Sequence, residues 1–263
     1  MKKVSFLILA LVAIFILGIY VLEKSKPTYQ EVEGEQMEIN QNKIKIDQGM
    51  SEGESEMLTA DRGSTVEEET NYIFAYQSIP EPIKETMKGV SWQEKNPVSL
   101  EDLSYVQVAY WGFDGEIHQG EIIVHQQLAL EVQEIFRELY EAKFPIEKMV
   151  LIDEYNGDDE SSMADNNTSA FCSRPITGKQ NVYSKHSYGV AIDINPVQNP
   201  YQKGELILPP IGEVYLDRSK NAKGMIQVGD PCYTAFISRG WSWGGDWIDR
   251  KDYHHFEKNI PNS

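Results

Sequence analysis

Two short segments of the chain combine histidine with aspartate among polar and aromatic residues. In the first segment, His186 precedes Asp193 by seven positions. The second segment contains Asp252, His254 and His255. A catalytic zinc ion takes three protein ligands of the imidazole and carboxylate types and keeps a further position open for water. Two histidines and one aspartate from these segments satisfy that requirement, but a histidine and an aspartate at this spacing are common in any chain and do not by themselves predict a metal centre.

The spacing also indicates how the chain can bring these groups together. Gly189 allows a turn after His186, so that a loop histidine and a strand aspartate converge, which a continuous strand would prevent. Asp252 can then accept a proton from the attacking water and return it to the leaving amine. Spacing does not choose between His254 and His255. In an extended segment Asp252 shares a face with His254, and in a helical turn it shares a face with His255.

Short strands and two helices are predicted to position these residues. Alternation of apolar and polar residues indicates strands, and apolar residues at three- and four-residue spacing indicate a helix. The predicted strands cover residues 105–111, 121–124, 149–152 and 190–194, and the predicted helices cover residues 126–143 and 233–238. The sequence therefore predicts an α+β domain with a small antiparallel sheet and flanking helices.

Three blocks of sequence, taken together, resemble the signature of a known peptidase family. In chain order the blocks are Ser184-x-His186-x-x-Gly189-x-Ala191-x-Asp193, Trp243-Gly-Gly-Asp246-Trp247 and Asp252-x-x-His255-Phe256. Their order and content are similar to those of the VanY-type D-alanyl-D-alanine carboxypeptidases and the related L-alanyl-D-glutamate endopeptidases. The resemblance covers roughly residues 105–258.

The resemblance implies a fold and a role for four residues. In that family, the histidine and aspartate of the first block and the histidine before phenylalanine in the last block are zinc ligands, which implies His186, Asp193 and His255. The acidic residue three positions before the last ligand is the general base, which implies Asp252. The implied fold is that of the zinc D,D-peptidases, the hedgehog/DD-peptidase type.

Further residues are implied to contact the substrate. Residues 166–174 resemble the block in which an arginine binds a substrate carboxylate or stabilises the tetrahedral oxyanion, which implies this role for Arg174. We also predict substrate contacts for Ser184 and Tyr188, with a place in the aromatic core as the alternative for Tyr188. The chain departs from the family at His254, where proline is usual. This departure leaves open whether the imidazole supports the site or is exposed.

Composition and charge restrict the partners. The 263 residues carry a formal net charge of −17. An acidic protein repels phosphate backbones and gains nothing from counterion release, so nucleic acid is not expected as a partner. Cys172 and Cys232 are too few for a disulfide framework and lack the spacing of a thiolate zinc site. Whether one bridge joins them stays open, and the sequence indicates no oligomeric state.

The N-terminal region is predicted to anchor the protein in the cell membrane. Two lysines precede an apolar run, and residues 1–23 are long enough to span the hydrocarbon core of a bilayer. We expect a single-pass, uncleaved signal anchor with its N-terminus inside the cell; if the segment is cleaved, the protein is secreted. Residues 24–71 are acidic and polar and predict a disordered stalk. Residues 72–263 are then the extracellular catalytic domain.

These features together predict zinc-dependent hydrolysis of an amide bond in peptidoglycan stem peptides. Residues 166–171 and 195–201 resemble the carboxypeptidase branch more, so removal of terminal D-alanine is favoured and L-alanyl-D-glutamate cleavage is the alternative. Two further alternatives are a non-catalytic, zinc-containing wall-binding module and a signalling relative that shares only the fold. The presence of Asp252 argues against both, because binding alone needs no general base.

Overall fold

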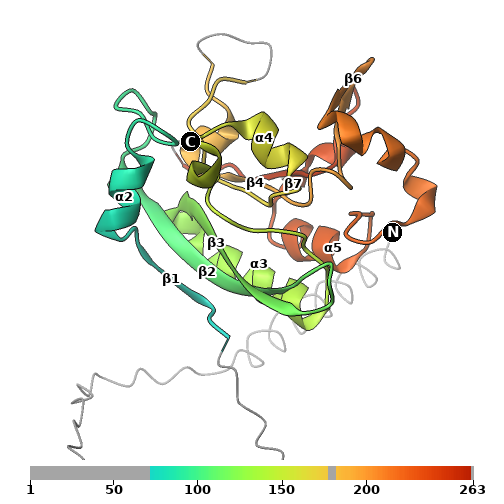
Figure 1. Cartoon of the computed structure of the whole chain (residues 1–263), viewed down its shortest axis with the longest axis horizontal. Helices are drawn as coiled ribbons and strands as arrows, with labels where there is room; N and C mark the ends of the chain where they lie inside the picture. The colour runs from blue at the N-terminus through green and yellow to red at the C-terminus, as the bar shows by residue number, and fades with distance from the viewer. Residues whose placement is uncertain (1–71, 177–181, 262–263) are drawn as a thin grey trace, which may run out of the picture. The chain divides into compact units, whose positions relative to one another are not determined.

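Two long antiparallel strands are the centre of the N-terminal half. The computed structural model describes residues 72–176 and 182–261. Strand β2 (Leu103–Trp111) pairs with β3 (Ile117–His125) along its whole length, and β1 (Ala75–Ser78) pairs with the other edge of β2 (Figure 1). The predicted strands in this region therefore form, and they extend beyond their predicted ends.

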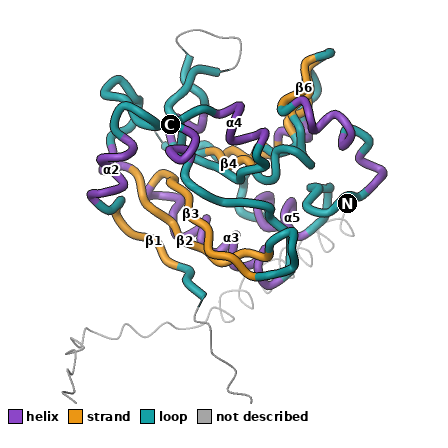
Figure 2. The backbone as a smooth tube through the Cα atoms, viewed as in Figure 1, coloured by secondary structure: helices purple, strands orange, loops and turns teal. Residues whose placement is uncertain are grey.

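The main apolar core lies between this sheet and helix α3 (Ala129–Glu141) (Figure 2). The helix buries apolar residues at three- and four-residue spacing, namely Val132, Ile135, Phe136 and Leu139. Burying each such side chain contributes about 1.5–3 kcal/mol. Alternate residues of β2, Val106 and Val108, belong to the same core. Leu103 and Tyr105, on the opposite face of the strand, enter a second, smaller cluster with Met87 of helix α2 (Glu81–Met87).

Two further three-stranded, antiparallel sheets lie in the C-terminal half. The first has the order β4–β9–β7, with the strands Ala191–Asp193, His255–Glu257 and Ser242–Trp243. The second has the order β6–β5–β8, with the strands Leu206–Leu208, Tyr201–Lys203 and Lys251–Asp252. Each sheet joins a segment before residue 210 to a segment after residue 240, which brings the two histidine-containing segments together.

The remaining helices are short. Helix α5 (Pro231–Ile237) begins after Asp230, whose side chain accepts a hydrogen bond from the Tyr233 N–H, and it buries Phe236 in the main core. Helix α4 covers Asp159–Ala164. The 3-10 helices are η1 (Leu100–Asp102), η2 (Gln126–Leu128), η3 (Ile152–Tyr155), η4 (Lys185–Tyr188), η5 (Pro210–Tyr215), η6 (Arg218–Lys220) and η7 (Gly244–Asp246).

The structure confirms a mixture of helices and small antiparallel sheets and corrects some details. The predicted strand at residues 149–152 is wrong. The backbone N–H and C=O of Val150 bond to the side-chain amide of Asn167, so they are not available to a neighbouring strand. Cys172 and Cys232 are both free and buried, which settles the question of a bridge between them.

The predicted anchor at residues 1–23 and the predicted stalk at residues 24–71 lie outside the described residues. Among residues 72–176 and 182–261, no helix combines the length and the apolar character needed to cross a bilayer. The described residues all fall within one compact unit, Val66–Ser263.

Candidate metal centre

Asp193 and His255 face each other across two antiparallel strands. They are direct partners in the register of β4 and β9. The backbone N–H and C=O of Asp193 both bond to Ser169 on its other side, so the pair is of the non-hydrogen-bonded kind, in which side chains lie closest. Nδ1 of His255 is 2.9 Å from Oδ1 of Asp193. The strand neighbours Ile192 and Phe256 alternate to the opposite face and are buried in the main core.

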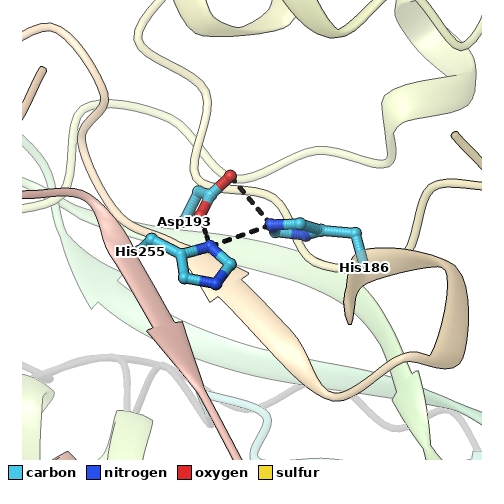
Figure 3. A group of neighbouring side chains, drawn as sticks. All are labelled: His186, Asp193 and His255. Carbon is cyan, nitrogen blue, oxygen red and sulfur yellow. Dashed lines mark hydrogen bonds and ion pairs between the residues drawn. The ribbon is translucent and has the colours of Figure 1, made fainter. Parts of the chain in front are cut away.

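A 3-10 turn brings His186 to this pair from a third segment. The turn begins at Ser184, whose hydroxyl accepts from the His186 N–H, and ends at Gly189, which has a φ of 69°. A Cβ at this glycine would lie 2.6 Å from the backbone nitrogen of His125, so no other residue fits. Nε2 of His186 is 3.1 Å from Oδ2 of Asp193 (Figure 3). The turn predicted at Gly189 is present.

In each of the two imidazoles, one nitrogen, here called inner, faces the other candidate ligands, and the second, here called outer, contacts the surrounding protein. Nδ1 of His186 lies 2.5 Å from the carbonyl oxygen of Ala170. Nε2 of His255 lies 3.1 Å from Oε2 of Glu257. Both oxygens are acceptors, so the outer nitrogens carry the hydrogens. In the neutral rings, the inner nitrogens then hold lone pairs, although they are only 3.2 Å apart (Figure 3).

The lone pairs of the two inner nitrogens and the negative charge of the Asp193 carboxylate repel one another unless a positive charge lies between them. The ligand atoms of these three buried residues all lie within 4.8 Å of one another. Burial lowers the pKa of His255, but Asp193 and Glu257 outweigh burial and raise it to about 10, so a proton is retained when no metal is bound. A divalent cation satisfies all three acceptors at once. The three residues therefore fit zinc, which takes imidazole and carboxylate ligands.

The group opens onto a cavity of about 200 Å³, which Arg174, Ser184 and Asp252 also line. Nη2 of Arg174 is 3.1 Å from Oδ2 of Asp159 and 3.9 Å from Oδ2 of Asp193. Its Nε is buried and has no hydrogen-bond partner among the described residues. The guanidinium of Arg174 thus lies beside the candidate centre and lines the cavity, and its planar cationic group is suited to an anion.

The tryptophan-rich block holds the backbone around Asp252. This aspartate ends β8, opposite Tyr201 of β5. A Cβ on Gly244 would lie 2.5 Å from the carbonyl oxygen of Asp252, so glycine is needed here for the two segments to approach. The indole N–H of Trp243 donates to the carbonyl oxygen of Tyr253 at 2.8 Å. The middle block of the sequence signature thus contributes to the packing around the proposed base.

His254 lies beside Asp252 and outside the three-residue group. Its Nε2 is 2.8 Å from Oδ1 of Asp252 and 3.9 Å from Oδ2 of Asp193. Burial lowers the pKa of His254, but the two carboxylates outweigh burial and raise it to about 9. Burial raises the pKa of Asp252, but His254 outweighs burial and lowers it, so this carboxyl group is ionised. Of the two histidines between which spacing did not choose, His255 is the one whose imidazole lies beside the other two candidate ligands.

The two predicted substrate contacts differ in their positions. Ser184 lines the cavity, although its hydroxyl accepts from the His186 N–H. Tyr188 lies outside the cavity lining and packs against the main core. A 3-10 helix has about three residues per turn, so residues two positions apart, such as His186 and Tyr188, point in different directions. The core position weighed for Tyr188 is the one observed.

Three groups that support the site were not predicted. Glu257 and the carbonyl group of Ala170 accept hydrogen bonds from the two imidazoles, and Asp159 pairs with Arg174. Glu257 did carry a signal, because it follows His255 by two positions and residues two apart in a strand share a face. Nothing in the sequence indicated the other two groups. Any residue has a backbone carbonyl group like that of Ala170, and Asp159 lies 15 positions before Arg174.

Two imidazoles and a carboxylate beside a cavity with a base and a guanidinium define a candidate metal-dependent hydrolytic centre. Residues 177–258 match the family model of D-alanyl-D-alanine carboxypeptidase, and the match covers 82 of the 263 residues. All three candidate ligands and Asp252 fall within it, whereas Arg174 precedes it. No curated protein and no solved structure matches the chain. The family match confirms the resemblance carried by the three sequence blocks.

Proposed function

We propose that this protein is a zinc-dependent peptidase that removes terminal D-alanine from peptidoglycan stem peptides. The observation that carries the proposal is the buried group of His186, Asp193 and His255, whose inner atoms are acceptors that need a cation. The family match over residues 177–258 supports the class of reaction and the carboxypeptidase in particular. It also supports the hedgehog/DD-peptidase type as the finer description of the α+β domain.

The residues around the group have separate tasks in the proposed reaction. A bound zinc ion supplies a Lewis acid and lowers the pKa of water. The ionised Asp252 accepts a proton from the attacking water and transfers it to the leaving amine. Arg174, whose guanidinium lines the cavity, holds a substrate carboxylate or the developing oxyanion. Glu257 keeps His255 in the tautomer that presents Nδ1 to the cation.

Defined muropeptides test this proposal. The purified chain is incubated with pentapeptide and tetrapeptide muropeptides, with and without a chelator, and the products are identified by mass spectrometry. We expect the pentapeptide to lose its terminal D-alanine, the chelator to abolish this loss, and added zinc to restore it. Cleavage between L-alanine and D-glutamate gives products of different mass and would identify the endopeptidase instead. Bound zinc without any product would identify a wall-binding module.

We also propose that the protein is held in the cell membrane by residues 1–23, with the catalytic domain outside. The two lysines before the apolar run support this orientation, and a peptidoglycan substrate requires an external active site. Fractionation of cells that express the full chain tests the location. Recovery in the membrane fraction after alkaline extraction is expected, whereas recovery in the medium would indicate a cleaved signal.

A further inference from the structure

His254 is a buried polar residue of the cavity that the proposed reaction leaves unused. It follows Asp252 by two positions and directly precedes His255. Its side chain lines the cavity, and the residue is only 4% exposed. An imidazole buried to this extent needs polar contacts to offset the loss of its hydration. Proline, which is usual here in the family that the chain resembles, has no side-chain donor to offer.

The surroundings of His254 determine which of its nitrogens carries a hydrogen. Nε2 lies 2.8 Å from Oδ1 of Asp252 and 3.9 Å from Oδ2 of Asp193, and both oxygens are acceptors. Nδ1 is buried and has no hydrogen-bond partner among the described residues. Because Nε2 faces the carboxylate of Asp252, this nitrogen carries a hydrogen whether the ring is neutral or charged.

The carboxylate of Asp252 depends on this contact. Its Oδ1 is buried and has no aligned hydrogen bond within the described residues, and Nε2 of His254 is its ion-pair partner. The backbone of Asp252 is fixed by strand β8 and by the close approach of Gly244. The side-chain torsions of an aspartate nevertheless remain free unless contacts of the carboxylate restrict them. A base that must take and return a proton at one place needs that restriction.

We propose that His254 is a positioning residue for the general base, an inference that rests on the proposed function. The 2.8 Å contact between its Nε2 and Oδ1 of Asp252 restricts the carboxylate and leaves Oδ2 to accept the proton of the attacking water. On the side of the candidate metal centre, Oδ2 of Asp193 lies 3.9 Å from the same Nε2, at ion-pair distance. The imidazole of His254 is therefore near both the proposed base, Asp252, and the candidate ligand Asp193.

Kinetics of full-chain variants on the pentapeptide substrate test this inference. His254→Leu removes the donor, and we expect kcat to fall about 10–100-fold while KM and zinc content stay unchanged. His254→Gln keeps an amide donor near the position of Nε2 and should restore most of this loss. In the Asp252→Asn background, His254→Leu should cause no further loss, because the two residues act as a unit.

His118→Leu is the matched control. His118 also pairs with an aspartate, Asp114 at 2.9 Å, but this pair is exposed and lies outside the cavity lining, so kcat should equal that of the wild type. Unchanged kcat in His254→Leu, a loss of zinc in parallel with kcat, or losses that multiply in the double variant would each overturn the inference. An inactive wild-type protein would overturn the proposed function and the positioning role with it.

A measurement on the metal-free protein tests the contact without any turnover. Imidazole-selective ¹H–¹⁵N NMR should show a slowly exchanging Nε2–H resonance that His254→Leu removes and Asp252→Ala shifts. Asp114→Ala, which alters the control pair, should leave this resonance in place. A His254 resonance that does not respond to Asp252→Ala would overturn the proposed contact, even in an active enzyme.

Discussion

His186 and His255 illustrate how residues outside a candidate metal centre prepare it. The outer nitrogen of each ring is fixed by an acceptor, the carbonyl oxygen of Ala170 in one case and the carboxylate of Glu257 in the other. These contacts orient the inner nitrogens before a cation arrives, so less freedom is lost on binding. In each ring, the acceptor beside the outer nitrogen thus determines that this nitrogen carries the hydrogen.

Substitution of Glu257 tests this orientation. Glu257→Leu removes the acceptor of His255 and should weaken zinc binding about 10–100-fold, because the hydrogen is then no longer held on Nε2. Competition with a chelating indicator measures the affinity. Glu257→Gln keeps an oxygen acceptor and should lose less. Equal zinc affinities of the wild type and Glu257→Leu would show that this contact does not orient the ring.

Substitution of Asp252 separates chemistry from metal binding. Asp252→Asn should bind zinc normally, because Asp252 lies outside the three-residue group. It should lower kcat about 10²–10⁴-fold, because an amide cannot accept the proton. Zinc analysis and steady-state kinetics measure the two effects, and Asp114→Asn, at an exposed position outside the cavity lining, is the control. Near-normal turnover of Asp252→Asn would remove this residue from the mechanism.

At the scale of elements, the candidate centre is built from very short pieces. The turn η4 has four residues, and strands β4 and β9 have three each. The residue pattern of the three blocks predicted which side chains meet, but β9 and the whole β6–β5–β8 sheet were not predicted. Strands of two or three residues contain too little periodicity to be read from sequence, because their pairing is decided by segments far away in the chain.

Gly189→Ala tests the turn that positions His186. Any residue other than glycine is strained at a φ of 69°, and the new Cβ would also meet the backbone nitrogen of His125 at 2.6 Å. Gly240→Ala is the control, because Gly240 has a φ of 80° and no atom within 4 Å of the added Cβ. The control should lose about 1–3 kcal/mol of unfolding free energy from backbone strain alone. Urea denaturation should show a larger loss for Gly189→Ala, and equal losses would contradict the steric argument.

At the scale of the whole molecule, the two halves differed in how well the sequence predicted them. Strands β2 and β3 and helix α3 are long and periodic, so their existence followed from the pattern of apolar residues. The apolar run at residues 149–152 was misleading, because the side chain of Asn167 takes the backbone hydrogen bonds of Val150. When a side chain takes the backbone hydrogen bonds that a neighbouring strand would otherwise make, the pattern of apolar residues does not reveal it.

Zinc should also stabilise the molecule as a whole. A ligand present at 100 times its Kd adds about 2.7 kcal/mol to the unfolding free energy when it binds only the folded state. Thermal denaturation of the chelated protein should therefore give a lower Tm than denaturation with excess zinc. Magnesium, which prefers oxygen ligands, should not reproduce the shift. Neither should zinc added to His255→Ala, and a shift that persists in this variant would place the metal elsewhere.

The direct pairing of Asp193 with His255 links correct folding to correct chemistry. Side chains alternate along a strand, so a slip of β9 by one residue would turn the histidine into the core and expose Phe256 to the cavity. A molecule in this register would lose the burial of the Phe256 side chain and would bury the imidazole of His255 in its place. Burial of Phe256 in the core therefore fixes the register of β9, and the correct register places His255 beside Asp193.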